Sequence, residues 1–165
     1  MINIVLHEPE IPQNTGNIGR TCVATGMLRH LLKPLGFSLD EKQLKRAGLD
    51  YWSDLDVTVY EDYGDFLSKN EGAKIYYATT KGHLVYTQAQ YEPDCYIMFG
   101  KESAGIPEEI LREHEGTCVR IPMIGETRSL NLSNAVAIVA YEALRQLDFE
   151  GMKMKGELHR LTWSN

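Results

Sequence analysis

The sequence lacks the residue spacings that identify several common enzyme and metal-binding classes. It has three cysteines and no CxxC pair, which gives no support for a zinc ribbon or a thioredoxin-type redox site. Its five histidines show no HExxH spacing, so we expect no metal site. The GxGxxG, Walker A and GxSxG motifs are also absent, which disfavours a Rossmann cofactor site, ATP hydrolysis and an α/β-hydrolase nucleophile, respectively. We therefore expect Cys22, Cys95 and Cys118 to be buried free thiols.

Long apolar runs and an excess of basic residues are also missing. No run reaches membrane-spanning length, and the chain begins with a strand-like segment rather than a basic leader, so we expect a cytoplasmic protein with no membrane partner. The 17 Lys and Arg residues are outnumbered by 23 Asp and Glu, for a net charge of −6. This argues against a strongly basic nucleic-acid binder on average, although phosphate responds to a local patch. Lys42, Lys45 and Arg46 share one helical face and are such a candidate, with a solvated helix face as the alternative.

Strand and helix patterns alternate along the whole chain. A chain of 165 residues suits one domain and is short for two. Alternation of this kind predicts an α/β fold with a parallel sheet. We predict one domain over residues 1–150 and a loosely docked polar tail over residues 151–165. The predicted strands are 2–7, 30–33, 57–60, 74–78, 95–99 and 117–121, and the predicted helices are 15–27, 40–47, 63–69, 107–114 and 133–149.

Four polar loops follow predicted strands. Parallel sheets bind ligands beyond the carboxyl ends of their strands, so these loops are expected to meet at one edge. Each loop also has a structural explanation, since Asn14, Thr15, Asn131 or Ser133 could cap a helix and Gly100 and Gly105 could serve turns. Taken together, four such loops favour a ligand site. They are residues 12–20, 79–82, 99–107 and 121–134.

The helix after the fourth loop is apolar nearly all round. Its first turns read Ala-Val-Ala-Ile-Val-Ala over residues 135–140. A helix of this composition is expected to be buried on most sides. The uncharged hydrogen-bonding groups just before it suit a ligand with many donors and acceptors.

Three of these loops resemble the motifs of a known superfamily. Asn14 with Arg20, the stretch FGKESAG at 99–105, and IPM at 121–123 followed by SLNLSN at 129–134 are similar to motifs one, two and three of the SPOUT RNA methyltransferases. The opening HEPEIPQNTGNIGRTC at 7–22, KPLGF at 33–37 and KRAGLDYW at 45–52 narrow the resemblance to the YibK-like (TrmL) group of tRNA 2′-O-methyltransferases. The resemblance covers about residues 1–149.

The resemblance implies properties that composition and spacing do not. It implies S-adenosylmethionine-dependent methylation of the ribose of the wobble nucleotide, position 34, within a tRNA anticodon stem-loop. It implies a homodimer built partly on the first and last helices, and a parallel-sheet SPOUT fold with a C-terminal deep trefoil knot, which is a rare topology. One position departs from the pattern. Ala104 stands where relatives often carry arginine, which puts a phosphate or RNA contact there in doubt.

The resemblance also assigns roles to individual residues. Arg20 would act at the reacting hydroxyl, either within its own subunit or by reaching across from the other subunit, and Asn14 would hold the Arg20 loop in shape. Ser129 and Asn131 would fix the donor or the ribose. Glu102 could pair with a donor hydroxyl or only stabilise its loop. The expected donor-binding residues are Ala78, Gly100, Glu102, Ile121, Met123, Ser129 and Leu130, with Met123 and Leu130 packed on the adenine.

Basic side chains and the first-helix region would contact the RNA, and the basic residues are Lys33, Lys42, Lys45, Arg46 and Arg128. In the last helix, Tyr141 and Glu142 would be structural or would lie at the dimer contact. Two alternatives to tRNA methylation stay open. One is the same chemistry on another RNA such as ribosomal RNA, and the other is a non-catalytic, RNA-binding knotted dimer.

Overall fold

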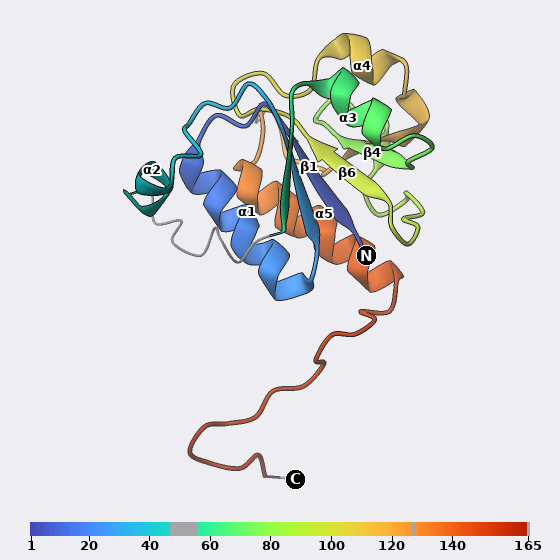
Figure 1. Ribbon diagram of the computed structural model, residues 1–165. Helices are drawn as coiled ribbons and strands as arrows, with labels where there is room; N and C mark the ends of the chain where they lie inside the picture. Colours follow the sequence, from blue (N-terminus) through green and yellow to red (C-terminus); the bar gives the residue numbers. More distant parts are fainter. Residues whose placement is uncertain (47–55, 127, 165) are drawn as a thin grey trace.

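Seven short strands form one parallel sheet, which confirms the predicted α/β class. The computed structural model describes residues 1–46, 56–126 and 128–164. Its strands stand in the order β3-β2-β1-β6-β4-β7-β5, and all pairings between them are parallel (Figure 1). The strands are β1 (Asn3–His7), β2 (Leu28–Leu32), β3 (Val57–Tyr60), β4 (Ile75–Ala78), β5 (Leu84–Val85), β6 (Tyr96–Phe99) and β7 (Cys118–Arg120).

Helices cover both faces of the sheet. The long helices α1 and α5 lie side by side on one face, and the short helices α3 and α4 lie over the other (Figure 1). The short helix α2 stands at the edge of the molecule (Figure 1). The helices are α1 (Pro12–Thr25), α2 (Glu41–Arg46), α3 (Tyr63–Lys69), α4 (Glu108–Arg112) and α5 (Leu132–Gln146), with a 3₁₀ turn η2 (Glu115–Thr117) before β7.

The two faces explain why the central strands are apolar throughout. In β1, Ile4 and Leu6 pack in the core beneath α1 and α5, whereas Val5 packs in the core beneath α3 and α4. Successive side chains of a strand point to opposite faces, so a strand buried on both sides needs an uninterrupted apolar run. Each such side chain contributes about 1.5–3 kcal/mol by leaving water.

Helix ends differ from their predicted positions by a few residues. Helix α1 begins at Pro12, not at residue 15, because proline suits the first turn, and it ends before Gly26, whose φ is 71°. Asn14 and Thr15 therefore lie inside the helix, so the alternative that one of them caps it is wrong. Asp40 does accept a hydrogen bond from the Lys42 N–H at 2.8 Å, as expected of a cap. The predicted end of that helix, residues 47–48, lies outside the described residues.

The last helix corrects one expectation. Helix α5 buries Val136, Val139 and Ala140 against the sheet, but Ile138 and Tyr141 are 36% and 44% exposed. The prediction of burial on most sides is therefore wrong for one stripe of the helix in the single chain. The helix also begins one residue before its predicted start and ends at Gln146 rather than residue 149.

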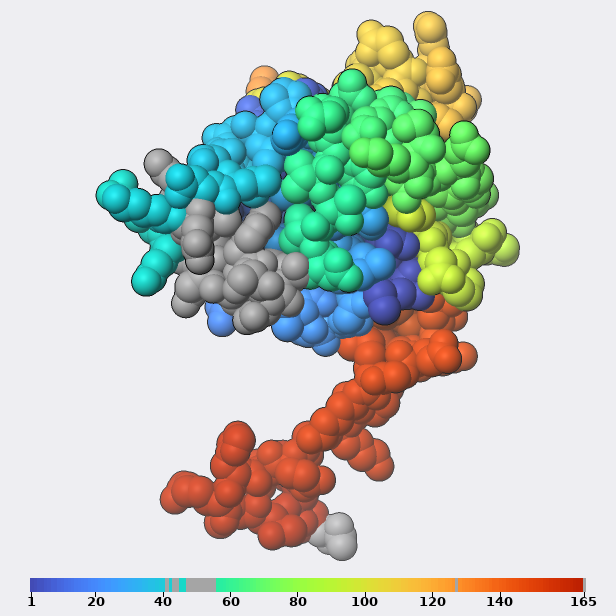
Figure 2. All heavy atoms as spheres, viewed as in Figure 1, coloured from blue at the N-terminus to red at the C-terminus, as the bar shows by residue number. Residues whose placement is uncertain are grey.

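Smaller features complete the fold. The strand β5 was not predicted, since two residues carry too little pattern. The three cysteines are free and buried, as predicted, and burial raises the pKa of the Cys22 thiol to about 11. Among the described residues, no helix is long and apolar enough to cross a bilayer. Beyond Met152, which packs on the core, the chain leaves the body as an extended arm (Figures 1 and 2).

Candidate functional site

The four predicted loops meet at the carboxyl edge of the sheet and enclose one pocket. Its volume is about 650 Å³. The sheet order brings the ends of β1, β6, β4 and β7 next to one another, which is why loops far apart in sequence become neighbours. The lining residues are Ile11, Asn14, Ala78, Val119, Ile121, Met123 and Ala135, together with residues 79–81, 99–106 and 128–132.

All seven residues predicted to bind the donor line this pocket. They are Ala78, Gly100, Glu102, Ile121, Met123, Ser129 and Leu130. Three of the four predicted catalytic residues, Asn14, Ser129 and Asn131, line it too. The fourth, Arg20, does not. It is exposed on α1, six residues beyond Asn14, and six residues turn a helix by about 240°, so the two side chains leave different sides of the helix.

Glu102 holds the start of α1. Its carboxylate accepts hydrogen bonds from the backbone N–H of Glu10 at 2.8 Å and of Ile11 at 3.1 Å, and from Asn14 Nδ2 at 3.3 Å. The first N–H groups of a helix have no partner within it, and a negative charge there also favours the helix dipole. The Ile11 cap position supplies no such group itself. These contacts show the loop-stabilising role considered for Glu102, and a contact with a donor hydroxyl stays a prediction.

A second carboxylate, that of Glu10, makes a reciprocal contact with the loop that carries Glu102. Glu10 Oε1 accepts from the backbone N–H of Ser103 at 2.9 Å and from the Ser103 hydroxyl at 2.7 Å. These hydrogen bonds lower the pKa of the Glu10 carboxyl, because they stabilise its charged form. Glu10 was not predicted, because its partner lies 93 residues away in the chain and leaves no local signal.

Asn14 and Asn131 extend this network to α5. Asn131 Nδ2 donates to Asn14 Oδ1 at 3.1 Å. Asn131 Oδ1 accepts from the backbone N–H of Ser133 at 3.0 Å and of Asn134 at 3.3 Å, and therefore caps α5. The capping explanation thus holds for Asn131. The same side chain also ties the starts of α1 and α5 together through the buried amide of Asn14.

Two glycines allow backbones to approach closely, one in the pocket wall and one beside the loop that carries Glu10. A Cβ at Gly100 would lie 2.1 Å from the Gly105 carbonyl carbon, so no other residue fits there without moving the loop. A Cβ at Gly36, in the KPLGF stretch, would lie 2.6 Å from Glu10 Cα. The Gly36 N–H donates to the Pro9 carbonyl at 2.9 Å, which packs the loop after β2 against the loop that carries Glu10.

Three basic residues contribute to the wall of the pocket. They are Lys81, Lys101 and Arg128, and Lys81 pairs with Glu108 at 3.0 Å. Ala104 also lines it and adds no charge. The remaining predicted RNA contacts are exposed. Lys33 pairs with Glu61 at 3.3 Å, and Lys42, Lys45 and Arg46 lie on α2. The structure therefore does not gather the predicted basic residues into one patch around the pocket.

A family model and the sequences of known proteins both match this chain to RNA methyltransferases. The family described as SpoU rRNA Methylase matches residues 1–141. The tRNA (cytidine(34)-2′-O)-methyltransferase of Escherichia coli strain K12 is 46% identical over 156 residues, which cover 94% of this chain and 99% of that protein.

Two solved structures share the fold. One, described as "Structural insights into the 2-OH methylation of C/U34 on tRNA", has a TM-score of 0.83 and 44% identity, and covers 90% of this chain and 97% of that one. The other is an AdoMet-bound rRNA methyltransferase from Sinorhizobium meliloti. It has a TM-score of 0.76 and 26% identity, and covers 88% of this chain and 56% of that one.

Proposed function

The chain belongs to the SpoU rRNA Methylase family, and from this membership we propose that it methylates the 2′-hydroxyl of the nucleotide at position 34 of tRNA, with S-adenosylmethionine as methyl donor. The observation that carries the proposal is near full-length similarity to a protein of that activity, at 46% identity. The resemblance read from the three motifs is thereby confirmed at the level of the family. The pocket at the carboxyl edge supplies a site for the chemistry.

The pocket residues fit the proposed donor. Because Gly100 has no Cβ, the backbone of Gly105 and Ile106 packs directly against it, and this close contact shapes the loop that lines the pocket. Backbone groups of Ala78, Gly100 and Ile121 with the Ser129 hydroxyl would hold the polar parts of the donor, and Met123 and Leu130 would pack on its adenine. When bound, the donor supplies a methyl group on a positively charged sulfur.

The protein's own task is alignment and charge stabilisation. A ribose hydroxyl is a weak nucleophile, so it must be positioned in line with the methyl carbon and must lose its proton. Arg20 would orient the hydroxyl and the neighbouring phosphate and stabilise developing negative charge. It is not a simple general base, because a guanidinium holds its proton in proteins. Asn14 and Glu102 act as positioning residues for the helix that carries it.

A second copy of the chain would complete the site. Arg20 does not line the pocket of its own chain, and the exposed apolar stripe on α5 lies beside α1 on the same face. We therefore propose a homodimer formed through α1 and α5, in which Arg20 of one protomer reaches the pocket of the other. Tyr141 would lie in the contact, whereas Glu142, which pairs with Arg145 at 2.9 Å, would shape its helix.

The deep trefoil knot is also proposed, and the topology is compatible with it. Strand β6 lies between β1 and β4, although both precede it in the chain. The loops after β6 and β7 line the same pocket. When a later strand is inserted between two earlier ones, its connecting loops must pass other segments of the chain. A knot is one topology in which they can do so.

The substrate would be the anticodon stem-loop, in the cytoplasm. A single-stranded loop offers splayed bases and free 2′-hydroxyls. Lys33, Lys42, Lys45, Arg46 and Arg128 would contact phosphates, so affinity should fall steeply with salt. Methylation of another RNA and a non-catalytic RNA-binding dimer are the alternatives.

Nucleoside mass spectrometry tests the proposal directly. Bulk bacterial tRNA incubated with the protein and S-adenosylmethionine should gain 2′-O-methylcytidine or a 2′-O-methylated uridine that maps to position 34. Arg20→Ala should lower this rate by about 10²–10³-fold with donor binding nearly unchanged, whereas Arg112→Ala on α4 serves as the matched control. Methylation of ribosomal RNA alone would support the first alternative, and donor binding without any methylated ribose would contradict the assigned substrate.

A further inference from the structure

The segment 153–164 leaves the folded body without making contacts on it. All its residues are exposed, and Figure 2 shows it as an arm separate from the rest of the molecule. Within the part of the chain that the structure describes, no hydrogen bond or ion pair joins this arm to the body. The last hydrogen bond before the arm runs from the Met152 N–H to the Phe149 carbonyl, at 2.9 Å.

The arm carries more large apolar side chains than a solvated segment of this length needs. Met154, Leu161 and Trp163 are 67%, 70% and 61% exposed, and Leu158 is 36% exposed. Grouped apolar exposure of this kind marks a surface that binds another molecule. Tryptophan in particular is enriched among residues that anchor protein interfaces.

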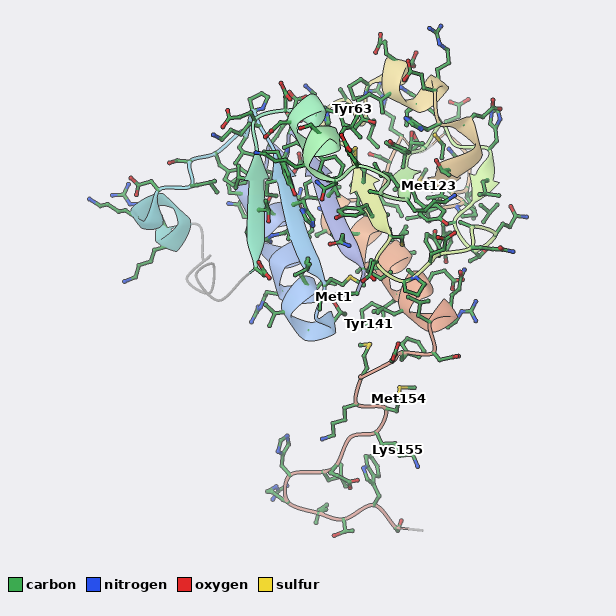
Figure 3. All side chains as sticks on the ribbon, turned by 45° about the vertical axis from the view of Figure 1, so that its right-hand side comes forward. Met1, Tyr63, Met123, Tyr141, Met154 and Lys155 are labelled. Atoms are coloured by element: carbon green, nitrogen blue, oxygen red, sulfur yellow. The ribbon has the colours of Figure 1, made fainter. Side chains whose placement is uncertain are left out.

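The arm departs from the end of the body at which the exposed stripe of α5 lies. Ile138 and Tyr141 of this stripe are exposed, as is Val23 on the neighbouring helix α1. Figure 3 places Tyr141 at the end of the body from which the arm departs, with Met154 and Lys155 beyond it. The arm is therefore continuous with the helical face through which we propose that two copies associate.

Charge also favours this chain as the partner. The arm with its last residue, 153–165, has three basic residues and one acidic residue, for a net charge of +2. Residues 1–152 have 14 basic and 22 acidic residues, for a net charge of −8. A basic arm is attracted to an acidic body of the same chain, and opposite charges across an interface assist association.

We propose that residues 153–164 form an arm that packs on the body of a second copy and strengthens the homodimer. This inference rests on the homodimer of the proposed function and deepens it. RNA fits the arm less well, because Met154, Leu158 and Leu161 offer phosphate no donors. The pocket also lies at the start of α5, and a helix of 15 residues separates it from the arm by about 22 Å.

Two matched triple variants test the arm by sedimentation across a dilution series. Leu158→Ser, Leu161→Ser and Trp163→Ser together should raise the dissociation constant of the dimer at least about tenfold. Lys153→Ala, Lys155→Ala and Arg160→Ala together should change it by less than about threefold at moderate salt, because exposed charges contribute little. Equal dimer strength in the wild type and the apolar variant would overturn the arm and leave the dimer intact. A wild-type chain that sediments as a monomer would overturn both, while the methylation assay judges the enzymatic proposal separately.

Fluorescence separates a protein partner from RNA. The chain has two tryptophans, so Trp52→Phe leaves Trp163 as the sole reporter. In the dimer, the Trp163 emission should be blue-shifted and shielded from acrylamide, and dilution to monomer should reverse both changes. Emission and quenching equal to those of free tryptophan at every concentration contradict docking. Shielding that develops only when an anticodon stem-loop is added would make the arm an RNA contact and overturn the inference.

Discussion

Two networks of polar side chains join distant segments of this protein, and they differ in what surrounds them. The carboxylate network consists of Glu10, Glu102 and Ser103 with Asn14 and Asn131, and most of its members line the pocket. The histidine network consists of Asn3, His30, Tyr60, Asn70 and Tyr96, none of which lines that pocket.

The histidine network makes its contacts away from the pocket. His30 Nδ1 lies 2.9 Å from the Tyr60 hydroxyl and Nε2 lies 3.0 Å from Asn3 Oδ1, so both ring nitrogens have partners. The ring also packs against Tyr60, Phe66 and Tyr96, with centroids 5.7, 6.2 and 5.3 Å away. Both nitrogens of the His30 ring are therefore used within the fold. Because their partners lie on the neighbouring strands β1 and β3, the ring stabilises strand pairing.

The carboxylate network satisfies backbone groups beside the pocket. It fixes where α1 and α5 begin, and these starts form the pocket wall. The comparison shows that burial of polar groups does not by itself indicate function. What distinguishes the two networks is whether the groups they hold in place face a cavity.

The largest expected effect comes from Glu102→Ala. The Glu10 and Ile11 N–H groups and the Asn14 amide would lose their acceptor, which should destabilise the fold by about 1–3 kcal/mol. Displacement of α1 should also lower the methyl-transfer rate by about 100-fold. Urea unfolding and the tRNA methylation assay measure the two effects, with exposed Glu109→Ala as control. Full activity in Glu102→Ala would show that the network does not position the site.

Acid should weaken the histidine network. Burial lowers the pKa of His30 to about 4 from its ordinary value of 6.5, so the unfolded chain binds the proton more readily. The associated stability is complete above pH 6.5 and is lost as the pH falls toward 4, by about 3 kcal/mol in all. Unfolding free energies measured at several pH values test this. His30→Leu should reduce the slope in this range and leave the part that comes from His7, whose pKa burial also lowers, and an unchanged slope in that variant would assign it to other groups.

A smaller effect is expected for His30→Leu at neutral pH. The Tyr60 hydroxyl and the Asn3 Oδ1 would each lose their contact with the imidazole ring, at a cost of about 1–3 kcal/mol of folding stability. Donor affinity, measured by calorimetry well below the melting temperature, should stay within about twofold, because additivity holds for separated sites. A marked loss of donor affinity would mean that the two networks are coupled.

The smallest effect concerns the exposed cations of α2. Lys45→Ala with Arg46→Ala should weaken stem-loop binding modestly, and the slope of log affinity against log salt should fall by about 1 for each phosphate that the variant no longer neutralises. Lys69→Ala, on α3 and paired with Asp65 at 3.1 Å, is the matched control. Identical salt slopes for the wild type and the double variant would exclude α2 from the RNA interface.

The order of strands and helices was predictable because its signals are local. Apolar runs such as β1 and amphipathic or capped helices such as α3 lie within a few residues of their predicted bounds. The loop positions of Asn14, Gly100 and Asn131 follow from the rule that ligands bind beyond the carboxyl ends of parallel strands. The two-residue strand β5 was missed because it is too short to show a period.

By itself, the sequence determined the parallel α/β class, the family, and most of the residues that line the pocket. Only the tertiary structure decided how those residues are used. Glu102 bonds the start of α1 and Asn14 bonds Asn131 across 88 and 117 residues of chain, and such partners leave no periodic signal in a sequence. The exposed stripe of α5 and the absence of Arg20 from the pocket wall were likewise decided by packing, because helix rotation against the sheet selects which side chains face the core.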